Sequence, residues 1–158
     1  MFIAKLIEEK LNSIGIRLSS PPQPIGSYVP LSQSGNLLYM SGQIPLSGGT
    51  LPEKFKGKVP SQVSTIDAVQ ASKQCTINAL EQMNNFLGNL ERISKFVKLT
   101  GYVNSDPSFK DHPKVINGAS DLLLEVFGER GKHTRVAVGV SSLPLDCVVE
   151  IDILCEVK

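Results

Sequence analysis

An arginine and a glutamate stand in two apolar, β-rich runs near the end of the sequence. Arg135 begins the first run, Glu150 lies near the middle of the second, and Leu143-Pro144-Leu145-Asp146 separates the two. We expect these runs to form a hairpin. A guanidinium binds a carboxylate through two parallel hydrogen bonds, and a carboxylate on a half-buried strand can orient or deprotonate a water molecule. The two residue types are therefore suited to holding a small acid and activating water.

Both residues also have structural interpretations. Structural ion pairs place charges in the same way, and on position alone an exposed or salt-bridged strand-end arginine is the stronger interpretation of Arg135. Glu150 fits equally well as a structural partner of Arg135 or Lys98. Asp152 shares the strand face of Glu150 but lies nearer the strand end, where we expect it to face solvent.

Three further residues are candidates for lining a pocket. A phenol such as Tyr28 can stack on a flat substrate and donate a hydrogen bond. Gly42 lets the backbone approach a ligand closely, and Asn117 is suited to the polar end of a pocket. The alternatives are a core or interface tyrosine, a turn at a strand end and a solvated helix residue.

The composition is that of an ordinary globular domain. The chain has 158 residues, 41% of them hydrophobic, and a net charge of +1, which predicts a single domain over residues 1–158. The near-neutral charge does not favour binding to nucleic acid or to a membrane surface. No apolar run approaches the roughly 20 residues of a membrane span, and residues 1–15 mix charges into apolar positions unlike a signal peptide.

The metal-binding and redox signals are weak. His112 and His133 are not spaced as metal ligands with any cysteine or carboxylate, and no phosphate-loop, triad or metal motif is present. The cysteines are Cys75, Cys147 and Cys155, of which we expect Cys147 and Cys155, in strand-like sequence, to be small buried hydrophobes. An odd count without a Cys-x-x-Cys motif argues against a disulfide framework and favours a reducing, cytoplasmic setting.

The apolar spacing predicts helices and strands in a fixed order. The expected elements are a helix over 2–14, strands over 27–29 and 36–40 paired across 32–35, a helix from about Ser64 to 87, a strand over 96–103, a helix over 113–127 and the final hairpin. Asp67 is placed as in a capping box with Ser64, and Gly88 suits the end of that helix.

This order predicts an α+β fold with an antiparallel or mixed sheet and two long helices on one face. The last strand is informative about the other face. Val149, Ile151 and Ile153 line one side, yet Leu154 shares the opposite side with Glu150. A sheet that is wet on one face alternates more cleanly, so we expect the second face to be buried against other subunits.

Several short motifs occur together in the order of a known family. They are Ile25-Gly26-Ser27-Tyr28, Ser41-Gly42-Gln43-Ile44-Pro45, Asn117, and Arg135 followed by Leu143-Pro144 and Glu150. In this the sequence resembles the Rid proteins, the reactive-intermediate deaminases of the YjgF type. The resemblance covers about residues 24–158, and the helical extension over 1–15 resembles a longer branch of the family.

The resemblance implies a chorismate-mutase-like fold and a homotrimer whose sheets form a central barrel, with active sites in clefts between subunits. It implies hydrolysis of enamines and imines, especially 2-imino acids, to 2-oxo acids and ammonia without a cofactor. In that reaction Arg135 grips the substrate carboxylate and Glu150 holds the attacking water, while Tyr28, Gly42 and Asn117 complete the pocket.

The sequence departs from the family at Ala137, where a cysteine is usual, and at Ser27, where a proline is frequent. These departures bear on substrate range rather than on the site. One alternative is a protein that binds or senses 2-oxo acids without turnover. The others are a ribonuclease or translation inhibitor, disfavoured by the near-neutral charge, and a hydrophobic holdase that would not depend on Arg135.

Overall fold

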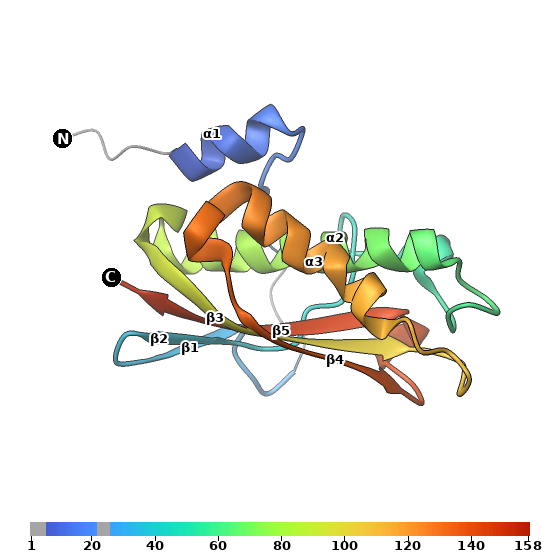
Figure 1. Cartoon of the computed structure of the whole chain (residues 1–158). Helices are drawn as coiled ribbons and strands as arrows, with labels where there is room; N and C mark the ends of the chain where they lie inside the picture. The colour runs from blue at the N-terminus through green and yellow to red at the C-terminus, as the bar shows by residue number, and fades with distance from the viewer. Residues whose placement is uncertain (1–5, 22–25) are drawn as a thin grey trace.

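The computed structural model describes residues 6–21 and 26–158, which form three layers (Figure 1). A short helix, α1 (Leu6–Ser13), lies outermost; two long helices, α2 (Thr65–Leu87) and α3 (His112–Phe127), form the middle layer; and a sheet forms the third. The strands are β1 (Leu31–Ser34), β2 (Leu37–Met40), β3 (Ile93–Asn104), β4 (Thr134–Val140) and β5 (Val149–Val157). In the described part of the chain, no helix has the length and apolar character to cross a membrane.

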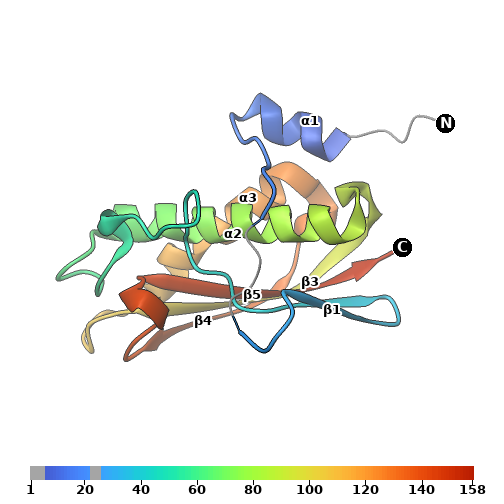
Figure 2. The same ribbon diagram turned by 180° about the vertical axis from the view of Figure 1, so that it is seen from behind.

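The described strands form one mixed sheet in the order β1-β2-β5-β3-β4. β3 and β4 run parallel, and the other neighbouring pairs are antiparallel. Both long helices cover the same face, as the view from behind also shows (Figure 2). The predicted mixed sheet with two helices on one face is therefore confirmed, and β4 is an edge strand.

Local signals at the ends of α2 act as the sequence predicts. The Ser64 hydroxyl oxygen accepts a hydrogen bond from the backbone N–H of Asp67 at 3.0 Å. This bond satisfies one of the free N–H groups of the first turn. At the other end Gly88 takes a left-handed conformation with φ of 75°, which glycine adopts without steric cost.

The two long helices pack unusually close to each other. A Cβ at Gly118 of α3 would lie 2.2 Å from the carbonyl oxygen of Val69 on α2. Ser72, which is buried on α2, accepts a hydrogen bond from the backbone N–H of Ala119 at 3.1 Å. Only glycine permits this approach, so Gly118 determines how deeply α3 sits beside α2.

Helix α1 lies against the far side of the helical layer, where Ile7 and Leu11 are buried. Glu91 ties it in place: one carboxylate oxygen accepts from the backbone N–H of Ile7 at 2.7 Å, and the other pairs with Arg130 at 3.3 Å. The sequence predicted a helix over 2–14; of that range, residues 1–5 lie outside the described part of the chain.

The predicted hairpin between the last two strands is wrong. β4 and β5 do not pair, because β3 lies between them. The chain leaves β3 through α3 and returns parallel to it as β4, the crossover that parallel strands require. The connection 141–148 then passes the end of β3, where the backbone N–H of Asn104 donates to Val148 at 2.9 Å and its side chain donates to Asp146 at 3.1 Å.

The predicted first hairpin is displaced. Residues 27–29 are not a strand; β1 begins at Leu31 and pairs with β2 across a turn at Gly35 and Asn36. Gly35 has a φ of 58°, which suits a tight two-residue hairpin turn. The correction leaves Tyr28 in the bend that precedes the sheet.

The close approach of α2 and α3 predicts that Gly118→Ala destabilises the protein. The added methyl group meets a backbone carbonyl, which cannot rotate away, and overpacking of this kind costs about 1–3 kcal/mol. Chemical denaturation followed by circular dichroism measures the change in the free energy of unfolding.

Asp121→Ala, at an exposed position of the same helix, is the control. Alanine favours a helix over glycine by roughly 0.5–1 kcal/mol where nothing obstructs it. A Gly118→Ala protein that is stabilised by that amount would contradict the close packing described above.

Candidate functional site

Arg135 and Asn117 lie together, as a shared site requires. Arg135 stands at the start of edge strand β4, paired with Leu99 of β3, and its side chain lies on the helix-covered face. Its Nη1 atom donates to Asn117 Oδ1 at 2.7 Å and to the Ser120 hydroxyl at 3.1 Å, both on α3. These two hydrogen bonds from one nitrogen fix the direction of the guanidinium.

A partly buried hydrogen-bond chain continues behind this contact. Ser120 Oγ lies 2.9 Å from His133 Nε2, and His133 Nδ1 lies 2.6 Å from the carbonyl oxygen of Gly131. A carbonyl only accepts, so Nδ1 carries a proton and donates to it. The Ser120 hydroxyl oxygen accepts from Arg135. We call Arg135, Asn117, Ser120 and His133 the arginine cluster.

Sequence reasoning missed two members of this cluster. It assessed His133 only as a metal ligand and did not consider Ser120. The spacing of the residues could have identified both. His133 lies two residues before Arg135 on an extended segment, and Ser120 lies three residues after Asn117 on a helix. Those spacings place each pair on one face of its element.

Arg135 carries an uncompensated charge. Among the described residues it forms no ion pair, and no hydrogen bond involves its Nε or Nη2 atom. Neither Arg135 nor Lys98 forms an ion pair with Glu150 among the described residues, so the interpretation of Glu150 as a structural partner of either residue is wrong. The free edge of the guanidinium has the geometry for a bidentate carboxylate contact.

Glu150 lies near the start of β5, on the face that the helices leave open. It pairs with Tyr102 of β3, and a Cβ at Gly42 would lie 1.9 Å from its Oε1 atom. The absence of a side chain at Gly42 thus permits close approach of the Glu150 carboxylate, and its predicted approach to a ligand stays a prediction. Tyr28 lines the same cavity as Gly42, and we call Tyr28, Gly42 and Glu150 the glutamate cluster.

Burial and a neighbouring carboxylate both raise the pKa of Glu150 above its ordinary value, with burial the larger cause and Asp152 the second. In the described part of the chain its carboxylate has no hydrogen-bond partner that would stabilise the charge. Asp152, expected in open solvent, is half-buried and accepts from the Tyr102 hydroxyl at 3.0 Å. A carboxyl with a raised pKa exchanges protons nearer neutral pH.

The two clusters lie on opposite faces of the sheet. Arg135 shares the face of its neighbours Leu99 and Ile153, which are buried under the helices, whereas Glu150 shares the face of Tyr102 and Val138. One chain therefore brings Arg135 to Asn117 and brings Glu150 to Gly42. It does not bring these two pairs to one small molecule.

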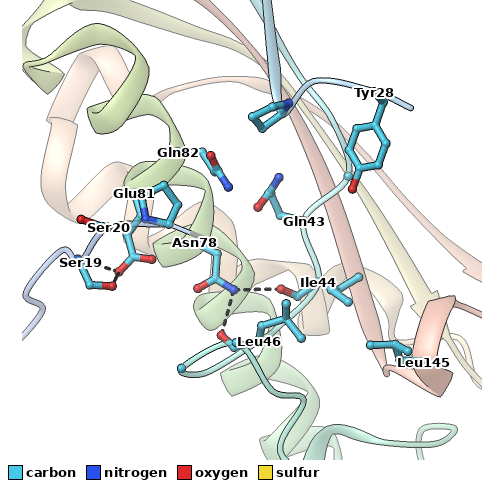
Figure 3. Close-up of a pocket in the computed structure, with 15 residues that line it drawn as sticks. Ser19, Ser20, Tyr28, Gln43, Ile44, Leu46, Asn78, Glu81, Gln82 and Leu145 are labelled. Atoms are coloured by element: carbon cyan, nitrogen blue, oxygen red, sulfur yellow. Dashed lines mark hydrogen bonds between the residues drawn. The ribbon is translucent and has the colours of Figure 1, made fainter. Parts of the chain in front are cut away.

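A cavity of about 680 Å³ adjoins the glutamate cluster (Figure 3). Tyr28 and Gly42 line it, together with the loop 43–49 and three side chains of α2: Asn78, Glu81 and Gln82. The sequence did not identify these α2 side chains as site residues. A polar residue on an amphipathic helix is expected to face solvent unless the loop that covers it is known.

The described residues contain no group of three histidine, cysteine or acidic side chains that could hold a metal. All three cysteines are free and buried, which confirms the predicted burial of Cys147 and Cys155. Cys75 and Cys147 both donate to the carbonyl oxygen of Val149, at 3.6 and 3.4 Å, and burial raises the pKa of Cys147 to about 12. Such thiols are poor nucleophiles.

A mixed sheet with two long helices packed on one face defines a chorismate-mutase-like architecture. Residues 8–157 match the family model described as "YjgF/chorismate_mutase-like, putative endoribonuclease". The chain therefore belongs to the YjgF family, which includes the Rid proteins.

Proteins similar to this chain cover nearly its whole length. Protein TCP17 of Trypanosoma cruzi is 39% identical over 96% of this chain and 94% of its own. The crystal structure of Atu1372 from Agrobacterium tumefaciens, a protein of unknown function, is 41% identical with a TM-score of 0.90, over 97% of this chain and 93% of that one. A 2-iminobutanoate/2-iminopropanoate deaminase of Dermatophagoides farinae is 26% identical over 85% of this chain and 91% of its own.

The raised pKa of Glu150 predicts that Glu150→Gln stabilises the protein at pH 7. An acid whose pKa is higher in the folded state contributes its full stability below the unfolded pKa, near the ordinary value of 4.5, and loses it as pH rises through the folded pKa. Glutamine keeps the neutral form at every pH. The gain should therefore vanish below about pH 4, and chemical denaturation at several pH values measures it.

Glu125→Gln removes a charge from an exposed position of α3 and controls for the change in net charge. A Glu150→Gln protein less stable than the wild type at pH 7 would show instead that the ionised carboxylate has a stabilising partner.

Proposed function

We propose that the protein hydrolyses 2-imino acids to 2-oxo acids and ammonia, in sites formed between the subunits of a homotrimer. The arginine cluster of one subunit binds the substrate carboxylate, and the glutamate cluster of a neighbour supplies the carboxylate that handles water. The reaction needs no cofactor, because an iminium carbon is already electrophilic and the protein has mainly to position substrate and water.

The observation that carries this proposal is the separation of two complementary half-sites on opposite faces of one sheet. Arg135 is pre-oriented by Asn117 and Ser120, and its charge is not neutralised by any described acid. Glu150 is held beside Gly42 with a raised pKa. Neither half is complete alone, and both become useful when two copies meet.

The open face of the sheet supports such an assembly. Its strands carry exposed apolar side chains: Val136 and Val138 are 42% and 40% exposed, and Tyr39 of β2 is 48% exposed. No helix of the described chain covers this face (Figure 1). β4, which carries Arg135, is also an edge strand with unpaired backbone groups on its outer side. Apolar faces and free edges of this kind are usually covered by a partner.

The chemistry balances without another reactant. Arg135 holds the carboxylate of the protonated imine, and Glu150 takes a proton from a water molecule as its oxygen bonds to C2. The proton then passes to nitrogen, the C–N bond breaks, and the carbonyl forms. One 2-iminium acid and one water give one 2-oxo acid and one ammonium ion. Proton transfer by a positioned carboxylate contributes about 10²–10⁴-fold to such a step.

The family context agrees with this activity. The deaminase of Dermatophagoides farinae is named for 2-iminobutanoate and 2-iminopropanoate, and it aligns over most of the chain. Its identity to this chain is 26%. The relative therefore supports the class of reaction, and the identity of the substrate has to be inferred from the residues of the site.

The proposal predicts that the wild type consumes 2-iminobutanoate and that Arg135→Ala does not. The imine is generated in place from threonine by a pyridoxal-phosphate dehydratase, and semicarbazide traps what escapes hydrolysis. Removing a charged clamp costs about 2–5 kcal/mol, so kcat/KM should fall by at least about tenfold.

Arg17→Ala, at an exposed arginine of the N-terminal region, is the matched control and should behave as the wild type. If the wild type does not suppress trapping, imine hydrolysis is the wrong activity for this substrate. Binding of 2-oxo acids without turnover, measured by calorimetry, then becomes the leading interpretation.

Sites shared between subunits predict complementation between two inactive variants. When Arg135→Ala and Glu150→Gln chains are co-refolded in equal amounts, about a quarter of the sites combine an intact Arg135 with an intact Glu150 from different chains. Activity should therefore rise to about a quarter of the wild-type value.

A mixture of Arg135→Ala with Asn117→Ala is the control, because both residues belong to the arginine cluster of one chain. That mixture should not recover activity above its components. Failure of the first mixture to recover would place Arg135 and Glu150 in separate functions, whatever the oligomeric state.

A further inference from the structure

The cavity beside the glutamate cluster has more room than the small imino acids considered above require. Its volume of about 680 Å³ lies in the range of pockets that bind whole metabolites, whereas 2-iminobutanoate carries only an ethyl side chain. Gly42 lines the cavity and also leaves the space that the Glu150 carboxylate occupies. A substrate whose reacting carbon lies near Gly42 and Glu150 therefore has room for a longer side chain in the cavity.

Asn78, on the α2 side of the cavity, is engaged with the protein itself. Its amide nitrogen donates to the carbonyl oxygens of Ile44 and Leu46, at 2.9 and 3.0 Å, and its Oδ1 atom accepts from the Gln74 side chain at 2.9 Å. An amide nitrogen has two hydrogens, so both serve to fasten the loop 43–49 to α2 (Figure 3).

The other amide and carboxylate side chains of the described lining are engaged in the same way. Glu81 accepts from the backbone N–H and the hydroxyl of Ser19, at 2.9 and 2.8 Å (Figure 3). Gln43 donates to the carbonyl oxygen of Ser41 at 3.1 Å, and Gln82 also interacts within the protein. These polar groups hold the walls together, and a ligand that competes for them must break contacts that already exist.

Apolar side chains supply the surface that the cavity offers to a ligand. They come from the N-terminal segment, the bend before β1, the loop after Gly42 and the turn before β5, and they are Pro21, Tyr28, Pro30, Ile44, Leu46 and Leu145. Such a surface gains free energy when an apolar group displaces water from it. The phenol ring of Tyr28 also packs well against another ring, offset or edge to face.

Leu145 lines the cavity from a strained turn. Its φ of 56° lies in the left-handed region that leucine rarely adopts, yet its side chain is 65% exposed. The turn is held by buried Asn104, whose amide nitrogen donates to Asp146 Oδ1 at 3.1 Å and to the carbonyl oxygen of Cys147 at 3.3 Å. Backbone strain that the surrounding structure maintains is typical of ligand-binding positions, and packing within this chain does not explain an exposed leucine there.

The charges of the lining disfavour a charged side chain on the substrate. Glu81 is the one charged side chain among the described lining residues. A second carboxylate on the substrate would enter a partly desolvated space without a cation and near an anion, which is unfavourable. A cation would meet a carboxylate that already accepts two hydrogen bonds from Ser19, and would lose water to apolar walls.

We propose that this cavity is the side-chain pocket of the enzyme and that it selects 2-imino acids with a bulky apolar side chain, in particular an aromatic ring. The inference rests on the proposed function, because it takes the reacting carbon to lie beside the glutamate cluster. It adds the class of substrate: an acid with one carboxylate, at the end held by Arg135, and an uncharged apolar group in the cavity.

Three 2-oxo acids of similar size test the proposal by isothermal titration calorimetry on the full-length protein. They are phenylpyruvate, 2-oxoadipate and 5-guanidino-2-oxopentanoate, which end in a phenyl group, a carboxylate and a guanidinium. We expect phenylpyruvate to bind about tenfold more tightly than each of the other two, the scale set by removing part of an aromatic ring from water. Equal affinities, or tightest binding of either charged acid, overturn the proposal.

Two variants assign the preference to the cavity. Leu145→Asn removes an apolar side chain, and asparagine tolerates the left-handed conformation of this turn. It should lower the affinity ratio of phenylpyruvate to 2-oxobutanoate by about fivefold, the scale of a partly lost leucine contact. Leu46→Asn provides the same test from the loop 43–49.

Leu124→Asn makes the same change at an exposed position of α3 outside the cavity and should leave the ratio unchanged. A ratio that neither Leu145→Asn nor Leu46→Asn lowers overturns the assignment of the preference to this cavity.

2-Oxobutanoate separates this inference from the proposed function. If 2-oxobutanoate binds in an Arg135-dependent manner but phenylpyruvate binds no more tightly than the charged acids, the side-chain pocket is wrong and the proposed function stands. If Arg135→Ala changes the affinity of neither 2-oxobutanoate nor phenylpyruvate, the proposed function fails. Absence of phenylpyruvate binding overturns the inference in either case.

Discussion

The parallel pairing of β3 with β4 is the constraint on which the arrangement of functional residues depends. Parallel neighbours need a crossover, and α3 provides it while packing on the sheet. The pairing places β4 at the edge, turns Arg135 toward α3 and forces β5 onto the other side of β3. Asn117 and Ser120 then meet Arg135 because the crossover helix that carries them lies over the strand it precedes. The same pairing leaves Glu150 on the opposite face.

The two clusters use different physical means to keep a reactive group available. Arg135 is held from behind by uncharged partners, so its direction is fixed while its charge remains for a ligand. Glu150 is placed beside a glycine, half-buried and near Asp152, so its proton affinity is raised. Both arrangements sacrifice some stability. A salt bridge would be more favourable for Arg135, and full solvation would be more favourable for the Glu150 carboxylate. Such concessions are typical of functional sites.

The family description names an endoribonuclease, and a relative is named a deaminase. We propose a small acid rather than RNA as the ligand. Its net charge is +1, whereas RNA binding depends on an excess of basic residues along a surface. The candidate site offers a guanidinium that has no ion-pair partner among the described residues, a carboxylate and a cavity of about 680 Å³, which are elements of small-molecule recognition.

The sequence alone determined the local features and the identity of most candidate residues. The Ser64 cap, the Gly88 stop, the helix-covered face and the buried cysteines follow from signals within a few residues of each other. Only the tertiary structure decided the pairing of the last strands, the position of Tyr28, the roles of Ser120 and His133 and the cavity over α2. A run of apolar residues specifies that a strand forms but not its neighbour, because the partner depends on where the intervening helix returns the chain. Likewise, a polar helix residue becomes part of a site only when a distant loop covers it.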